Sequence, residues 1–271
     1  MAADHELFRG PLPVTPTIVD SATPEQYRTC FDGKELGPRI PVWRVHGELA
    51  QPNFGLVCDP YGFTDSPDCE VIARGFDAKG PRSLAIARQG NWLLWGFCAS
   101  PSEMTEEARR VFLNAVVYMR QFDGQSPLVR KKASAREWAL VHASRVGQAG
   151  DRYARSRFVE ELLSAAGNDS GRLSAILAED LEYVRADGEG PFSIDAEAKA
   201  IGVSNRDLRL LDGCIGRLEG QADDDVARRL LERYTGERHA DAAAWRAWLD
   251  ERRDRLFFTD CGGYRWMASP R

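Results

Sequence analysis

The sequence predicts an α+β fold: an N-terminal α/β-type domain, then an α-helical domain that ends in a β-hairpin. Short β-prone runs with many aromatic residues fill the first part of the chain. From Ser134 onward, apolar residues recur three and four positions apart, which is typical of amphipathic helices. Near the end, two β-prone runs flank the turn Cys261-Gly262-Gly263. We therefore assign residues 1–130 to the α/β domain and residues 131–271 to the helical domain.

The beginning of the chain contains several short extended runs separated by Pro and Gly. Such runs are typical of strands that lie between turns. A Thr23-Pro24 step followed by Glu25 marks the start of a brief helix. The candidate strands are Ile18-Val19, Val42 to Val45, Gly55 to Cys58 and Glu70 to Ala73.

The clearest local pattern of the first domain predicts a strand, a turn, a second strand and a helix. Ser83 to Arg88 and Trp92 to Phe97 are β-prone, and Gln89-Gly90-Asn91 between them suits a tight connection. Ser100 with Glu103 matches a capping box, which predicts that the helix begins there. The expected apolar face of this helix consists of Ala108, Val111, Phe112, Ala115, Val116 and Met119.

The second half contains successive short helices, each with its own start or stop signal. Ser134 with Glu137 indicates a capping box, and Ser204 with Asp207 opens a later helix. The helix over Asp223 to Tyr234 is closed by Gly236, and Asp241 caps the last one. Because polar breaks are frequent, we expect stacked antiparallel pairs, either as a HEAT-like array or as an irregular bundle. The apolar positions include Trp138, Val141, Val146, Phe158, Leu162, Leu163, Leu173, Ile176, Leu177, Leu181, Val184, Leu208, Leu211, Ile215, Leu218, Trp245, Trp248 and Leu249.

The composition is that of a globular protein with a sizeable core. The chain has 271 residues, 43% of them hydrophobic, and a formal net charge of −5. Nucleic acid is a poor partner for it, since phosphate binding needs a basic surface. No apolar run reaches membrane-spanning length, so no membrane span is expected. The first residues lack signal-peptide features, which predicts a cytoplasmic protein, or a periplasmic or secreted one if a signal peptide was removed.

Six cysteines are spread along the chain without a metal-binding pattern. No two of them form a C-x-x-C pair and no paired Cys/His knuckle is present, which argues against a structural zinc site. Their even number permits disulfides, but we favour buried thiols because the spacing is too sparse for a disulfide scaffold. The cysteines are Cys30, Cys58, Cys69, Cys98, Cys214 and Cys261.

Cys98 is the candidate catalytic residue. It lies in Gly96-Phe97-Cys98-Ala99-Ser100 between a predicted strand and a predicted helix, which is the arrangement of a nucleophile elbow. A helix N-terminus behind a thiol favours the thiolate nucleophile and can stabilise an oxyanion. His142 and His239 are the conceivable bases. The alternative interpretation is a small buried residue in a tight turn.

An acidic loop before the central strands is the candidate metal site. Oxygen-rich loops with Gly and Pro can hold calcium, although the spacing here matches no EF-hand. Short acidic residues are also ordinary components of turns, so this interpretation stays open as well. The candidate ligands are Asp59, Asp65, Asp68 and Glu70, and calcium is the only cofactor that the sequence suggests.

Three other groups have both a functional and a plainer explanation. His46 next to a predicted strand is expected to be a packed or surface imidazole rather than a ligand. The pair Trp245 and Trp248 could stack on a sugar, but its spacing indicates helix core. A basic stretch could face a phosphate or an acidic partner, and is more often a solvated surface. That stretch contains Arg130, Lys131, Lys132, Arg136, Arg145, Arg152, Arg155 and Arg157.

Two segments resemble known protein groups. The run GFTDSPDCEVIARGFDAKGPRSLAIARQGNWLLWGFCASPSEMTEEARRVFLNAVVYM, residues 62–119, resembles a segment of uncharacterised, often secreted bacterial proteins. It is also similar to the closing strand–strand–helix of ThuA-like domains in the class I glutamine amidotransferase superfamily. The ending RYTGERHADAAAWRAWLDERRDRLFFTDCGGYRW resembles C-terminal modules of the same uncharacterised group.

The resemblance implies kinship of fold and a location in the cell envelope, but no site residues. In that superfamily the catalytic cysteine comes earlier in the domain, so Cys98 inherits no role from it. We expect a non-catalytic binding or scaffold protein whose ligand is a protein, a small molecule or a carbohydrate. The alternative is a hydrolase or amidotransferase-like enzyme that uses Cys98.

Overall fold

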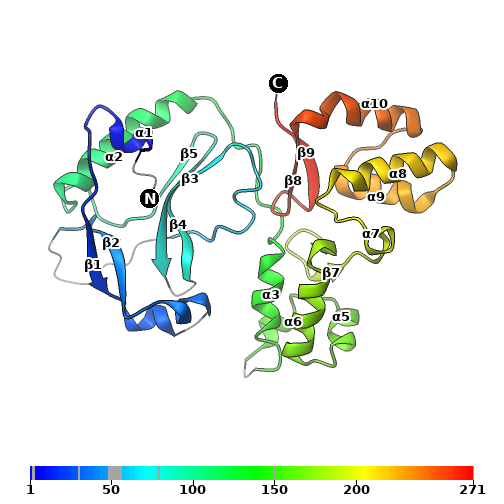
Figure 1. The fold of residues 1–271 in the computed structure, drawn as a ribbon, viewed down its shortest axis with the longest axis horizontal. Coiled ribbons are helices and arrows are strands. Elements are labelled where there is room, and N and C mark those ends of the chain that lie inside the picture. The colour runs from blue at the N-terminus through cyan, green and yellow to red at the C-terminus, as the bar shows by residue number, and fades with distance from the viewer. Residues whose placement is uncertain (2–3, 30, 48–56, 78–79, 149, 271) are drawn as a thin grey trace. The chain divides into compact units, whose positions relative to one another are not determined.

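The computed structural model describes residues 1, 4–29, 31–47, 57–77, 80–148 and 150–270. Helices occur together with small antiparallel sheets, which confirms the predicted α+β fold (Figure 1). The chain divides into two compact units, which are named here unit 1 and unit 2. Unit 1 comprises Met1–Thr64 and Asp68–Leu128, and unit 2 comprises Asp65–Pro67 and Val129–Arg271.

Unit 1 is built on antiparallel strands. β1 (Ile18–Ala22) pairs with β2 (Arg39–Trp43) in a two-stranded ribbon. β3 (Cys69–Asp77), β4 (Gly80–Gln89) and β5 (Trp92–Trp95) form a three-stranded sheet in that order. The ribbon and the sheet are separate, so unit 1 has two β layers rather than one continuous sheet.

Apart from the run Gly55 to Cys58, a strand lies at each expected place in unit 1, although the one expected at Val42 to Val45 runs instead from Arg39 to Trp43. The first half of the run Gly55 to Cys58 lies outside the described residues, and Cys58 forms a single antiparallel bridge to Leu84 of β4. The turn between β4 and β5 requires glycine. Gly90 has a φ of +52°, and a Cβ atom there would lie 2.8 Å from the backbone nitrogen of Pro127.

Helix α2 (Glu106–Met119) packs against the three-stranded sheet (Figure 1). Its residues Val111 and Ala115 share a hydrophobic core with Ile72 of β3 and Ile86 of β4. The predicted apolar face is largely confirmed, but Val116 is 56% exposed and lies outside this core. A wider set of side chains on the outer surface of α2 is also exposed and apolar: Leu113, Val116 and Val117.

The predicted start of this helix at Ser100 is wrong. The capping-box contacts do form, since the Ser100 amide and hydroxyl both donate to the Glu103 carboxylate, at 3.2 and 2.8 Å. They close an isolated turn because the next residue, Met104, is held extended by a β-bridge to His46. The helix begins only after Thr105, whose hydroxyl accepts the Ala108 amide at 3.2 Å.

Short helical segments complete unit 1. The brief helix expected near Thr23-Pro24 is confirmed as a single 3₁₀ segment, with Pro24 immediately before it. The helical segments are α1 (Glu6–Arg9), η1 (Glu25–Arg28), η2 (Phe31–Glu35) and η3 (Arg120–Phe122).

Unit 2 is mainly helical and includes two β-hairpins. Its α-helices range from 4 residues in α4 to 13 residues in α8, so the irregular bundle describes them better than a regular array. The hairpins are β6 (Val184–Ala186) with β7 (Phe192–Ile194), and β8 (Leu256–Thr259) with β9 (Arg265–Ala268). The helices are α3 (Glu137–Ala143), α4 (Arg152–Arg155), α5 (Glu160–Ala165), α6 (Ser170–Glu179), η4 (Leu181–Tyr183), α7 (Ala196–Ile201), α8 (Leu208–Gly220), α9 (Asp225–Thr235), α10 (Ala242–Arg252) and η5 (Arg253–Arg255).

Several local predictions for unit 2 are confirmed and three are wrong. Asp241 caps α10 through its carboxylate, and Gly236 ends α9 with a φ of +73°. The helix expected to open at Ser204 begins about one turn later, where Asp207 rather than Ser204 is the cap of α8. Ser134 does not cap α3, which has no side-chain cap. Val184 belongs to a strand rather than to the helix before it, because it pairs with Ile194 across the β6–β7 hairpin.

Two hydrophobic clusters form the core of unit 2, and the terminal hairpin takes part in both. Tyr264 is buried in the first cluster with Leu177 and Phe192, and Trp266 is buried in the second with Trp245. Phe258 packs against both clusters. The hairpin therefore docks on the helices of its own unit.

Candidate ligand pocket in unit 1

The structure does not place Cys98 at a helix N-terminus. Cys98 is exposed and lies in a segment without regular secondary structure, and the first residue of α2 is Glu106. The electrostatic help that a nucleophile elbow gives a thiol comes from a helix that starts directly behind it. The local geometry therefore lacks the feature on which the catalytic prediction depends.

The two histidines considered as bases belong to the core of unit 2. His142 stacks on Trp138, with ring centroids 5.6 Å apart, and burial together with Arg157 and Arg145 lowers its pKa to about 4. His239 contacts Trp245 edge to face, at 4.5 Å between centroids. Both rings serve as aromatic packing elements.

The four acidic residues proposed as calcium ligands are each engaged by a protein donor. Asp59 accepts the Tyr61 amide at 2.9 Å, and Asp68 accepts the Leu128 amide at 2.9 Å. Asp65 belongs to unit 2, where it accepts the Asp260 amide at 3.2 Å. Among the residues that the structure describes, no group of three or more His, Cys, Asp or Glu side chains is arranged to hold a metal ion.

Glu70, the fourth of these residues, is the centre of a partly buried polar cluster. Its carboxylate accepts the Nε2–H of His5 at 2.8 Å and the Nε–H of Arg88 at 3.2 Å, and it also accepts the Tyr118 hydroxyl. His5 Nδ1 accepts the amide of Leu7, which fixes the ring proton on Nε2. These donors outweigh partial burial and lower the Glu70 pKa, while burial and Glu70 raise the Tyr118 pKa to about 12.

A second polar network lies in the interior of unit 2 and was not predicted. Arg136 and Asp260 are both 0% exposed and form a two-pronged ion pair, with nitrogen–oxygen distances of 2.9 and 2.8 Å. The Arg136 guanidinium also donates to the Leu181 carbonyl and to the Asn205 amide oxygen, each at 2.9 Å. In the sequence, Arg136 looks like one member of a basic surface stretch.

The Asp260 carboxylate accepts hydrogen bonds from several donors of unit 2. It accepts a third charged donor, the Arg206 guanidinium, at 3.0 Å, as well as the Arg136 amide at 2.9 Å. Burial alone would raise its pKa, but these donors and positive charges hold the Asp260 pKa below its usual value. The network is therefore a structural tie between α3, the segment before α8 and the β8–β9 turn.

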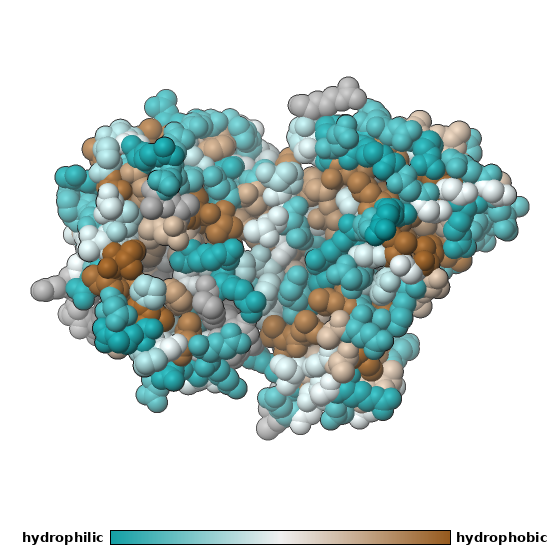
Figure 2. Space-filling view, viewed as in Figure 1, coloured by the Kyte–Doolittle hydropathy of each residue, from teal (hydrophilic) through white to brown (hydrophobic). Residues whose placement is uncertain are grey.

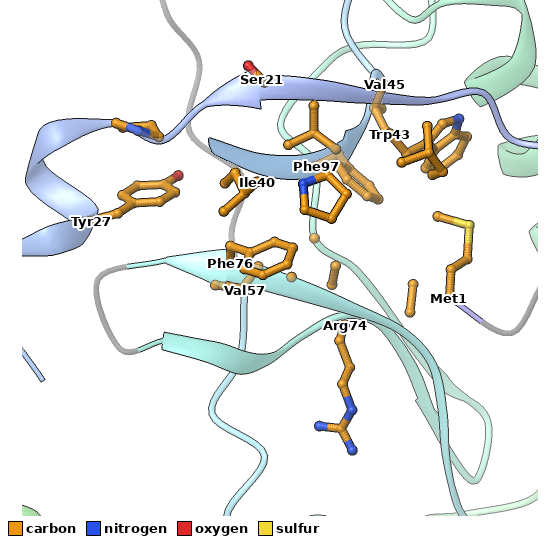
Figure 3. Close-up of a pocket in the computed structure, with 18 of the residues that line it drawn as sticks. Met1, Ser21, Tyr27, Ile40, Trp43, Val45, Val57, Arg74, Phe76 and Phe97 are labelled. Carbon is orange, nitrogen blue, oxygen red and sulfur yellow. The ribbon is translucent and has the colours of Figure 1, made fainter. Parts of the chain in front are cut away.

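A hollow among the described residues lies between the two β layers of unit 1. It has a volume of about 710 Å³. Figure 3 shows the side chains of Ile40 and Phe97 between the β2 ribbon on one side and β3 on the other. Tyr27 lies at one end of the hollow and Met1 toward the other. We call this hollow the slot.

Aromatic rings form much of the wall of the slot. Trp43 and Phe97 meet edge to face with centroids 5.7 Å apart, and Trp95 contacts Phe97 in the same way at 5.1 Å. These contacts fix the rings, and the Trp43 indole N–H donates to Glu107 of α2 at 3.2 Å. Phe76 lies over β3 and faces the slot (Figure 3).

Small residues keep the floor of the slot open. Ala73, Gly75, Ala85 and Gly96 all line it, from β3, β4 and the segment after β5. A Cβ atom at Gly75 would lie 2.7 Å from Val57, so a larger residue cannot enter there without displacing that side chain. A flat floor of small residues opposite aliphatic side chains of β2 suits a flat, apolar ligand.

Few polar groups face the slot. Among the described residues that line it, the polar side chains are Ser21, Tyr27, His46 and Arg74. In Figure 3 the Tyr27 hydroxyl points along the slot, whereas the Ser21 hydroxyl and the Arg74 guanidinium point away from it. The visible face of the molecule is otherwise mostly hydrophilic, with smaller hydrophobic patches (Figure 2).

Comparisons with known proteins add nothing to this geometry. No protein-family model matches the chain, and neither a curated protein nor a solved structure does. Among the described residues no helix has both the length and the apolar character needed to cross a bilayer.

Proposed function

We propose that unit 1 is a non-catalytic binding module that takes up a small, mainly apolar ligand in the slot. The observation that carries this proposal is a hollow of about 710 Å³ with aromatic walls and a floor of small residues. Ligand sites are usually concave and largely apolar, with a few polar groups that orient the ligand. A volume of this size falls in the range of about 300–1,000 Å³ found for drug-sized ligands.

The contacts around the slot support a site that exists before the ligand arrives. Trp43 and Phe97 are held by ring contacts and by the bond from Trp43 to Glu107. Walls fixed in this way lose little conformational freedom on binding, which favours affinity. Cys98 does not line the slot, so this proposal assigns it no role.

A screen of small aromatic and aliphatic compounds tests the proposal. We expect several of them to raise the melting temperature and to bind with dissociation constants at or below about 1 mM. Ala85→Phe places a ring on the floor of the slot and should weaken binding at least about tenfold. Val116→Phe adds the same bulk on the exposed face of α2 and should leave binding unchanged.

Two results would contradict the proposal. One is a screen in which no compound binds the folded wild-type protein. The other is a set of bound compounds whose affinities are the same in wild type and in Ala85→Phe, with both proteins shown to be folded by circular dichroism. Ligand-observed NMR measures each affinity directly.

A further inference from the structure

The outer face of helix α2 carries an apolar stripe. The inner face packs on the three-stranded sheet through Val111 and Ala115. On the outer face, Leu113, Val116 and Val117 are 48%, 56% and 49% exposed. Because successive residues of an α-helix are about 100° apart, Val116 and Val117 lie within about 60° of Leu113 around the helix axis. The three side chains therefore form one continuous surface.

The second half of α2 lacks the charged residues that a solvent-facing helix normally carries. Residues 111–119 read VFLNAVVYM and contain no Asp, Glu, Lys or Arg. The polar side chains of this run, Asn114 and Tyr118, are buried on the inner side, where Asn114 donates to the Leu7 carbonyl at 3.0 Å. A helix that is apolar all round is normally covered all round, and adjacent exposed apolar residues mark a contact surface.

Opposite charges lie at the two ends of this surface. Glu106 and Arg120 are each seven residues, or about two turns, from Leu113, so both lie on the same face of the helix. The backbone of Arg120 is still helical, with a φ of −61° and a ψ of −24°. We call the surface the α2 stripe, and it consists of Glu106, Arg110, Leu113, Val116, Val117 and Arg120.

Both end charges are available to a partner. The Glu106 side chain is 64% exposed, and its ion pairs with Arg109 and Arg110, at 3.2 and 2.9 Å, leave acceptor sites on the carboxylate free. Arg120 is exposed and makes no ion pair with any residue that the structure describes. The α2 stripe therefore has an acidic end, an apolar middle and a basic end.

This order of charges is complementary to itself when two copies of the helix run in opposite directions. A twofold axis at Leu113 places Glu106 of each copy opposite Arg120 of the other. The same axis places Arg110 opposite Val116, where the methylene stem of the arginine covers the exposed valine. A parallel arrangement would bring like charges together at both ends, which is unfavourable.

We propose that two copies of this chain associate through the α2 stripe, with the helices antiparallel and Leu113 on the twofold axis. The apolar middle drives the association, and the ion pairs at the ends fix its direction and register. Because each copy contributes a small apolar surface, the association is weak and reversible, with a dissociation constant on the order of 100 µM. The inference does not depend on the ligand proposed for the slot.

Sedimentation velocity of the full chain tests the association. Concentrations from about tenfold below to about fivefold above that dissociation constant should shift the protein from monomer towards dimer. Leu113→Lys places two positive charges on the axis and should weaken the association at least about tenfold. Trp92→Lys is the matched control, because it also replaces an exposed apolar residue, 70% exposed and on β5, and it should leave the dimer unchanged.

A mixing experiment tests the antiparallel arrangement. Glu106→Arg and Arg120→Glu each bring like charges together at both ends, so each variant alone should associate about threefold to tenfold more weakly than wild type. An equimolar mixture of the two variants should regain the wild-type affinity, because every mixed dimer has an arginine opposite a glutamate at both ends. Circular dichroism confirms that each variant is folded.

Four outcomes would overturn the proposal. One is a wild-type protein that stays monomeric at the highest concentration. Another is a dimer that Leu113→Lys leaves unchanged, because it must use a different surface. A Trp92→Lys variant that is as damaging as Leu113→Lys would show that the α2 stripe has no special role. A mixture that associates no more tightly than its two components would exclude the antiparallel register.

Discussion

The two units contain similar residue types and use them in opposite ways. In unit 2 the interior charges of Arg136 and Asp260 satisfy one another, and neighbouring groups take up the remaining donors. In unit 1 the aromatic rings of Trp43, Phe76 and Phe97 border a hollow that the described side chains do not fill. Buried polarity alone therefore does not indicate a ligand site. The ligand site proposed above rests instead on a hollow beside rings that their neighbours hold in place.

The largest expected difference between the units concerns two thiols. Cys98 in unit 1 is exposed, whereas Cys214 in unit 2 is buried in α8 and burial raises its pKa to about 12. Iodoacetamide should therefore modify Cys98 in the native protein at the rate of an ordinary exposed thiol. Cys214 should react at least about a thousandfold more slowly, because it reacts only after unit 2 opens.

Peptide mapping by mass spectrometry at several labelling times measures both rates. A Cys98 that reacts much faster than a small-molecule thiol at the same pH would revive the enzyme alternative, since that is the behaviour of an activated nucleophile. Rapid native labelling of Cys214 would show instead that the helical core is not closed as described. The same sites labelled in urea provide the control for intrinsic reactivity.

The next largest effect is expected from breaking the buried ion pair. Asp260→Asn leaves the Arg136 guanidinium buried without its counter-charge, which should cost about 3–5 kcal/mol in the free energy of unfolding of unit 2. Asp20→Asn is the control, because Asp20 pairs with Arg39 at an exposed position of unit 1 and should have little effect. Urea denaturation followed by circular dichroism measures both.

An unchanged unfolding midpoint in Asp260→Asn would contradict the view that polar groups in unit 2 are structural. The pH dependence offers a second check on the same residue. Because the folded-state pKa of Asp260 is lowered, its contribution is present above the unfolded-state pKa of about 3.9 and is lost as the pH falls further.

Local sequence signals predicted the helices and strands of both units well where the residues that give the signal also make the contacts that form the element. Asp241 and Gly236 cap helices by contacts within one turn, so their roles are readable from the sequence. Ser100 and Glu103 show the limit. Their mutual contacts form as predicted, but a bridge from Met104 to His46, more than fifty positions away, delays the helix.

The candidate sites were harder to predict because they depend on distant contacts. Asp65 and Asp68 are neighbours in the sequence, yet one belongs to unit 2 and the other to unit 1. Arg136 is the only member of its basic stretch that is fully buried, and this depends on Asp260, 124 positions away. The slot itself combines β1, β2, β3 and β4, and no motif in the sequence marks their meeting.

A smaller effect is expected from the buried histidine of unit 2. The pKa of His142 is about 4 when folded and near 6.5 when unfolded, so the unfolded chain binds more protons between these values. Stability should therefore be full above about pH 7 and fall by about 2–3 kcal/mol as the pH drops from 6.5 to 4. Unfolding free energies measured at half-unit intervals of pH test this.

His142→Phe keeps an aromatic ring beside Trp138 and removes the titrating group, so it should flatten the pH profile in that window. His46→Gln, in unit 1, serves as the matched control and should leave the unit 2 profile unchanged. If the profile of His142→Phe follows that of the wild type, the pH dependence comes from other groups. The loss below pH 4 should persist in both variants, because it belongs to carboxylates such as Asp260.

The smallest effect on the free energy of unfolding is expected from Glu70 of unit 1, which is either a metal ligand or a structural hydrogen-bond acceptor. Its side chain is 35% exposed and already accepts hydrogen bonds from His5, Arg88 and Tyr118. Glu70→Gln should therefore lower the free energy of unfolding by about 1 kcal/mol, discounted for solvent screening. The loss should be the same in excess calcium and in excess chelator, because these donors do not depend on a metal ion.

A wild-type protein that calcium stabilises, together with a Glu70→Gln variant that calcium does not stabilise, would instead assign Glu70 to a metal site. Asp59→Asn measured in parallel separates the cases, since a shared calcium ion would make the two substitutions lose the same calcium-dependent stability.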